Sequence, residues 1–144
     1  MRLTIFTFFL AIFFASCTKS DYRTLEGVWL LEHVNLCVLA DCLDVLEDQQ
    51  TRDKFDKIEL RLSRGRDAQA RFYKTGILLY TFDFEFILDE EMGRISFLGP
   101  NDHDFQNFFG SNVAIVDAKK NELVYQAIED VPNEETIYIF KRLQ

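Results

Sequence analysis

The feature that most restricts how this chain can fold is a strict alternation of aromatic and polar residues between positions 80 and 86. Tyr80, Phe82, Phe84 and Phe86 occupy the even positions, and the odd positions between them hold a threonine and two acids. Successive side chains of a β-strand point to opposite faces of its sheet, whereas a helix would spread these four rings over two opposite sides. The segment is therefore predicted to be a strand with one buried aromatic face.

The same period of two recurs in other segments, and turn-forming residues such as Gly65, Gly76 and Gly93 separate several of them. The predicted strands are residues 25–36, 55–62, 68–73, 80–86, 94–98, 112–117, 123–128 and 136–143. A weaker strand is expected within residues 105–110, and the total is about eight. One short helix is predicted after the first strand, within Asp41–Asp53.

Strands joined in this order by short turns favour an antiparallel meander. A sheet with one apolar face must either close on itself or pack against a second sheet, and closure removes the exposed edges. The predicted fold is therefore all-β, an up-and-down antiparallel barrel of about eight strands, with a two-sheet sandwich as the alternative. A length of 144 residues fits one such domain.

The N-terminus has the composition of an export signal. Met1 and Arg2 precede an uncharged and mostly apolar stretch from Leu3 to Ala15. This stretch is too short to cross about 30 Å of hydrocarbon as a helix, and its length is typical of the apolar part of a signal peptide. A buried core helix and a short, retained membrane anchor are the alternatives.

The residues Phe-Ala-Ser-Cys at positions 14–17 resemble the lipobox of bacterial lipoproteins. The resemblance implies a signal peptide at 1–16 that is removed, a lipidated tether at 17–24 and a domain at 25–144. Cys17 would carry the fatty chains, palmitate among them, which contribute about 0.8 kcal/mol per buried methylene. Thr18 stands where an aspartate would imply retention at the inner membrane, so the expected location is the outer membrane, facing the periplasm or the cell surface.

Charge narrows the choice of partners. The chain has a formal charge of −8, which becomes −9 without residues 1–16, because Arg2 is the only charged residue among them. Nucleic-acid binding needs clustered lysine and arginine, so a nucleic-acid partner is excluded. The same charge argues against attraction to anionic lipid. Contact with the membrane is therefore expected only through the lipid at Cys17.

Two cysteines remain once Cys17 is assigned. Cys37 and Cys42 would lie in an oxidising compartment after export, and a disulfide between them is predicted. Closing so small a loop contributes about 2 kcal/mol. Two buried free thiols are one alternative. A zinc site that adds His33 and Asp44 is another, although it lacks the paired spacing of structural zinc sites.

The residues Leu-Glu-Gly-Val-Trp at positions 25–29 resemble the Gly-x-Trp signature that opens the first strand of lipocalins. The likeness is greatest to the short lipocalin-like domains of lipoproteins from Gram-negative bacteria. It implies that Gly27 and Trp29 close one end of the barrel and that a basic residue of the last strand lies across the Trp29 ring. Arg142 is the expected residue, with Lys141 as second choice. Such a contact contributes about 0.5–1 kcal/mol.

The aromatic face supplies the candidate site. Tyr80, Phe82, Phe84 and Tyr125 are predicted to line an apolar cup in which a tyrosine hydroxyl orients a small apolar ligand. A fully packed core is the alternative for the same side chains. Three further phenylalanines would rim the cup or, if exposed, dock on another envelope protein. These residues are Phe105, Phe108 and Phe109.

No catalytic constellation, cofactor motif or metal motif is found in the sequence. It contains no Gly-x-Ser-x-Gly, phosphate-binding loop or His-Glu-x-x-His. Residues 101–104 are rich in oxygen ligands but lack the spacing of a calcium loop, and turn formation explains them more simply. The protein is therefore expected not to be an enzyme. The two functional hypotheses are a lipid-anchored binder of a small apolar molecule and, alternatively, a ligand-free module that docks on another envelope protein.

Overall fold

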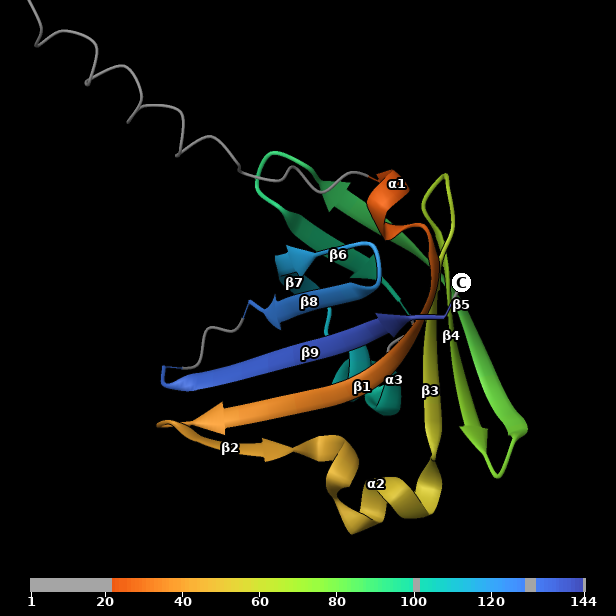
Figure 1. Cartoon of the computed structure of the whole chain (residues 1–144), viewed down its shortest axis with the longest axis vertical. Coiled ribbons are helices and arrows are strands. Elements are labelled where there is room, and N and C mark those ends of the chain that lie inside the picture. Colours follow the sequence, from red (N-terminus) through yellow and green to blue (C-terminus); the bar gives the residue numbers. More distant parts are fainter. Residues whose placement is uncertain (1–21, 100–101, 129–131, 144) are drawn as a thin grey trace, which may run out of the picture.

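A computed structural model of the chain describes residues 22–99, 102–128 and 132–143 (Figure 1). The β-strands are β1 (Gly27–Val38), β2 (Asp41–Asp44), β3 (Lys57–Leu62), β4 (Asp67–Lys74), β5 (Ile77–Asp89), β6 (Arg94–Leu98), β7 (Asn112–Ala118), β8 (Glu122–Ala127) and β9 (Glu134–Arg142). The helices are α1 (Tyr22–Leu25), the 3₁₀ turn η1 (Val45–Glu47), α2 (Gln49–Lys54) and α3 (His103–Phe109).

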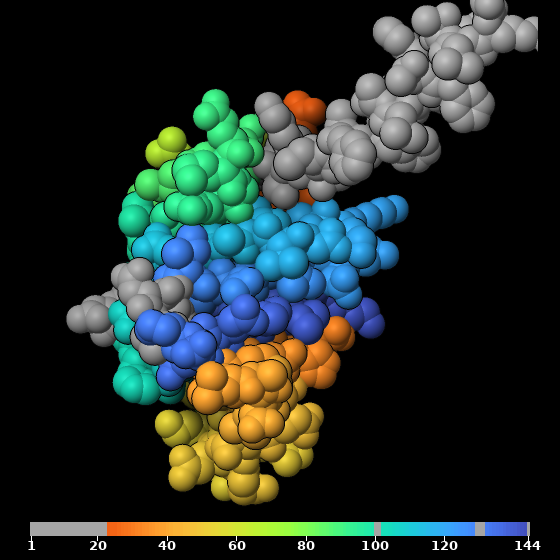
Figure 2. Space-filling view, turned by 90° about the vertical axis from the view of Figure 1, so that its left-hand side faces the viewer, coloured from red at the N-terminus to blue at the C-terminus, as the bar shows by residue number. Residues whose placement is uncertain are grey.

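Eight of these strands form a closed barrel. The strands from β3 to β9 each pair antiparallel with the next along the chain, and β1 pairs with β3 on one side and with β9 on the other. Figure 2 shows β7, β8 and β9, in light to dark blue, side by side with the orange β1. The predicted all-β, up-and-down barrel of about eight strands is confirmed. The short β2 lies outside it and pairs only with the end of β1.

The weak strand predicted within residues 105–110 is wrong, because this segment is the helix α3. Phe105, Phe108 and Phe109 are spaced by three and four residues, which places all three rings on one side of a helix. The carboxylate of Asp102 accepts a hydrogen bond from the Phe105 N–H and caps the start. Gly110 ends the helix with φ of 67°, a value that glycine adopts without strain.

The helix predicted within Asp41–Asp53 forms only in part. Residues 41–44 are the strand β2, and helical structure follows in two short pieces, η1 and α2. Each piece begins at an aspartate whose carboxylate accepts backbone N–H groups, Asp44 for η1 and Asp48 for α2. Because each aspartate has an extended backbone, a continuous helix cannot pass through it.

The interior is a continuous aromatic core. Phe72, Phe109, Tyr125 and Phe140 are fully buried, and their rings pack against one another or against a shared neighbour at centroid distances of 4.9–6.4 Å. α3 contributes Phe105, Phe108 and Phe109 to this core, all at most 4% exposed. The barrel of the described residues is therefore filled by its own side chains.

The core and the strand pairs that close the barrel all lie between Leu25 and Arg142. This part of the chain therefore contains what it needs to fold as a unit. The predicted signal peptide and Cys17 lie outside the described residues. Within the part that the structure describes, none of the helices combines the length and the apolar character needed to cross a bilayer.

Candidate ligand-binding site

The four residues predicted to line the aromatic cup surround α3. Phe84 on β5 packs against Phe105 at a centroid distance of 4.7 Å, and Phe82 packs against the same ring at 6.2 Å. Tyr125 on β8 reaches the last residue of α3, Phe109, through its hydroxyl. The structure thus places all four predicted residues next to α3, but Tyr80 is exposed, and Phe97 of β6 lies between Phe84 and Tyr125.

Both tyrosine hydroxyls of this group have protein partners. The Tyr80 hydroxyl donates to a carboxylate oxygen of Asp104 at 3.3 Å, and the Tyr125 hydroxyl donates to the backbone carbonyl of Phe109 at 3.1 Å. Burial and the charge of Asp104 raise the pKa of Tyr80 to about 12. Burial, with Tyr138 nearby, raises the pKa of Tyr125 well above its usual value. The hydroxyls hold α3 in place, and a role in orienting a ligand stays a prediction.

At the opposite end, Trp29 and Arg142 form the contact expected from the lipocalin resemblance. The Arg142 guanidinium carbon lies 4.2 Å from the centre of the Trp29 ring, and Trp29 Nε1 donates to the Leu25 carbonyl at 2.8 Å. Gly27 has φ of 147°, in the region that other residues rarely adopt. The second choice, Lys141, is exposed.

Cys37 and Cys42 are bonded, so the predicted disulfide is confirmed. They lie opposite each other in the β1–β2 hairpin, where antiparallel pairing brings their Cα atoms to 4.0 Å. Two sulfurs in a disulfide are not thiolates, which overturns the zinc alternative. His33 and Asp44, the other two members of that proposed set, do contact each other, at 2.7 Å.

The barrel wall splits between β1 and β3. Their pairing ends at Leu30 and Glu59, and the free edge of β1 next pairs, with β2, at Asn35. η1 and α2 lie across this gap (Figure 1). The split is a consequence of the long β1, which serves two different partners along one edge.

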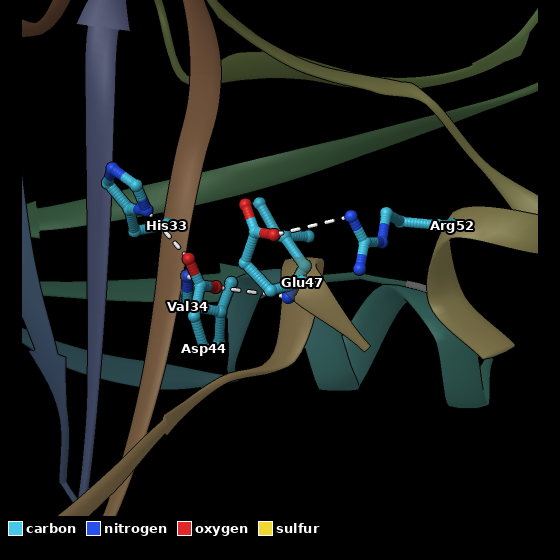
Figure 3. Close-up of polar contacts among 6 residues, drawn as sticks. His33, Val34, Asp44, Glu47 and Arg52 are labelled. Atoms are coloured by element: carbon cyan, nitrogen blue, oxygen red, sulfur yellow. Dashed lines mark hydrogen bonds and ion pairs between the residues drawn. The ribbon is translucent and has the colours of Figure 1, made fainter. Parts of the chain in front are cut away.

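Asp44 takes the place of a strand partner in the gap. One carboxylate oxygen accepts the backbone N–H of Val34 at 3.2 Å and of Leu46 at 3.0 Å, and the other contacts His33 at 2.7 Å (Figure 3). The bond from Val34 satisfies a backbone N–H of β1 at a point where no strand pairs with this edge. The bond from Leu46 caps the start of η1. One side chain thus joins η1 to the open edge of β1.

A pocket of about 410 Å³ lies in this split. Its apolar lining consists of Leu31, Leu46, Phe55 and Ile58, of which all but Leu46 are buried. Its other lining residues are polar or charged: Glu32, Glu47, Thr51, Arg52, Asp56 and Lys57. The volume falls within the range of about 300–1,000 Å³ typical of small-molecule sites.

Sequence reasoning did not identify this pocket. Its walls come from segments that are separate in the chain, and only the pairing of β1 with both β2 and β3 brings them together. One signal was present. Glu32 and His33 are adjacent polar residues that interrupt the alternation of the first strand. Such an interruption is typical of a β-bulge, where two neighbouring side chains point the same way.

The loop considered for calcium has structural roles in its described part. Asp102 caps α3, and Asp104 accepts from Tyr80 and lies 3.9 Å from Lys54. Asn101 lies outside the described residues. Among the described residues, no group of three or more histidine, cysteine or acidic side chains is placed to hold a metal ion.

The sequence matches no protein-family model, and no curated protein is significantly similar to it. Solved structures are similar in fold. A lipocalin-like protein from Bacteroides uniformis has a TM-score of 0.53 at 18% identity, over 83% of this chain and 99% of that one. An uncharacterized protein from Bacteroides eggerthii has a TM-score of 0.54 at 14% identity, over 85% and 99%.

A third similar structure is Japanin from Rhipicephalus appendiculatus, which was solved bound to cholesterol. Its TM-score is 0.56 at 10% identity, over 86% of this chain and 79% of that one. At these identities the likeness concerns the fold alone. The chain therefore contains a lipocalin-like barrel domain.

Proposed function

We propose that this protein is a lipid-anchored protein of the bacterial envelope that binds a small, partly apolar molecule in the pocket between β1 and β3. The observation that carries the binding proposal is the split in the barrel wall. It gives access to the buried side chains of Leu31, Phe55 and Ile58, while the barrel interior is filled. A cholesterol-bound neighbour with this fold supports an apolar ligand class.

The anchor is proposed from the sequence. A positively charged start, an apolar stretch and a lipobox-like sequence ending at Cys17 support export and lipidation. Thr18 supports an outer-membrane location. The neighbours are lipocalin-like or uncharacterized proteins, which agrees with a binding role and gives no support to an enzyme.

The alternative of a ligand-free docking module depended on exposed phenylalanines in residues 105–109. Phe105, Phe108 and Phe109 are the buried side chains of α3. They therefore provide no contact surface, and the binding role is the better supported of the two hypotheses.

Ligand binding can be measured with the fluorescent apolar amine N-phenyl-1-naphthylamine and chain 18–144, which retains every strand of the barrel. We expect a dissociation constant on the order of 10 µM, or about −7 kcal/mol. The variant Leu46→Trp places a bulkier indole side chain in the pocket and is expected to weaken binding by about tenfold or more.

Leu43→Trp is the matched control for this variant. Leu43 lies on the neighbouring β2, is 59% exposed and does not line the pocket, so binding should be unchanged. Thermal melting checks that both variants fold. Equal binding by Leu46→Trp and the parent chain would place the ligand elsewhere, and no binding by the parent chain would contradict the proposed function.

Lipidation is tested separately in cells. Cys17→Ala removes the acceptor sulfur, so incorporation of radioactive palmitate into the protein is expected to fall to background. Cys37→Ala with Cys42→Ala is the control, because these cysteines form the disulfide and should not affect labelling. Labelling that persists in Cys17→Ala would refute the anchor.

A further inference from the structure

Glu32 occupies a special position in β1. The pairing of β1 with β9 shifts between Leu31 and His33, which pair with Phe140 and Ile139, so Glu32 is the extra residue of a β-bulge. The bulge places Glu32 and His33 on the exposed side in succession, while Leu31 and Val34 stay buried. Bulges often redirect a side chain next to a functional site. Here the redirected residue is one of those that line the pocket between β1 and β3.

Other charged side chains around the pocket are neutralised by partners. The Arg52 guanidinium lies 3.4 Å from the Glu47 carboxylate (Figure 3). Lys57 Nζ lies 2.6 Å from the Glu59 carboxylate, and this hydrogen bond raises the pKa of Lys57. Both cations lining the pocket are thus already paired with an acid.

Two acids of the lining remain, and they differ. The carboxylate of Asp56 accepts the backbone N–H of Thr75 at 2.5 Å. The Glu32 side chain makes no hydrogen bond or ion pair with any other residue in the described ranges. Its carboxylate is therefore the one charge of the described pocket lining without a partner, and the same pocket is lined by the apolar residues Leu31 and Ile58.

We infer that the pocket takes a cationic amphiphile, with the apolar part against Leu31, Phe55 and Ile58 and an ammonium group beside the carboxylate of Glu32. This inference rests on the proposed function and names its ligand class. A positive head group gains Coulomb energy from Glu32, whereas an anionic head group would meet an unneutralised acid. The formal charge of −8 favours the same sign of ligand.

The test compares three eight-carbon amphiphiles that differ only in the head group: octyltrimethylammonium, octyl glucoside and octyl sulfate. Each is titrated below its micellar concentration into chain 18–144 by isothermal calorimetry at low salt. The cation is expected to bind at least about tenfold more tightly than the sulfate, with the glucoside between them. Glu32→Gln should abolish this order, and Glu32→Asp, which keeps the charge, should preserve it.

Glu90→Gln controls for net charge, because Glu90 is exposed at the β5–β6 turn and does not line the pocket. Its replacement changes the net charge of the chain by the same amount as Glu32→Gln. A preference for the cation that survives in Glu32→Gln, or that Glu90→Gln also removes, would overturn the inference. Equal binding of all three head groups would overturn it and leave the proposed function standing. If none of the three binds, both fail. Since Glu32 is exposed, Glu32→Gln is expected to melt like the parent chain.

Discussion

Replacing Phe109 with alanine is expected to lower the free energy of unfolding by about 4 kcal/mol. Phe109 is fully buried and packs against Phe72, Phe105 and Phe140, so truncation removes apolar contacts and leaves a cavity in the centre of the barrel. Phenylalanine-to-alanine changes at such sites cost about 3–5 kcal/mol. Urea unfolding followed by circular dichroism measures the difference.

Asn107→Ala is the control on the same helix, because Asn107 is exposed and its side-chain amide lies 2.7 Å from Nδ1 of the exposed His103. Its effect should stay within about 0.5 kcal/mol. A second measurement does not depend on how much stability Phe109→Ala loses. The cavity in Phe109→Ala should bind benzene, so a saturating concentration should raise the melting temperature of this variant and not of the parent chain. Equal stability of the two variants would contradict the role of α3 as the central part of the core.

Arg142→Ala is expected to lower the free energy of unfolding by about 3 kcal/mol, the second largest effect. The guanidinium donates to three backbone carbonyls, those of Thr24, Glu26 and Lys120, and lies over the Trp29 ring. Charge-assisted hydrogen bonds contribute about 1.5–3 kcal/mol each, and we expect less than their sum because Arg142 is partly exposed and the bonds are not independent. Equilibrium unfolding of the purified variant measures the loss.

Two variants separate charge from geometry at this position. Arg142→Lys keeps the positive charge over Trp29 but cannot reach three carbonyls in different directions, so it should recover only part of the loss. Lys141→Ala removes a charge from the adjacent, exposed position and should change the stability by no more than about 0.5 kcal/mol. If Arg142→Ala were as stable as Lys141→Ala, the stability of this end of the barrel would not depend on the contacts of the Arg142 guanidinium.

The fold was predictable because most of its strands bury one face. Buried residues alternate with half-buried ones over Ala68–Phe72 of β4 and with exposed ones over Phe84–Leu88 of β5, and the same period of two is visible in the sequence. The disulfide was predictable for a similar reason, since Cys37 and Cys42 are close in sequence and only a tight reversal lies between them.

The helix α3 and the pocket were missed for a different physical reason. The glycine and asparagine residues around the three phenylalanines do not favour a helix, but Asp102 and Gly110 are typical helix caps. The pocket depends on where β1 stops pairing with β3, and such a register change is set by tertiary contacts. The Glu32–His33 bulge was its one local sign.

The way η1 and α2 are attached has a consequence for how such a protein can diversify. They bridge a gap in the wall and take no part in the strand ladder. They are joined to the barrel through Asp44, through Val45 and Leu46, which pack against the core, and through the bond from Lys74 to the Arg52 carbonyl. Residues 45–54 can therefore be exchanged for a loop of different length or chemistry without disturbing a single strand pair. The ligand specificity of such a barrel can therefore change in evolution through this one segment while the strands stay the same.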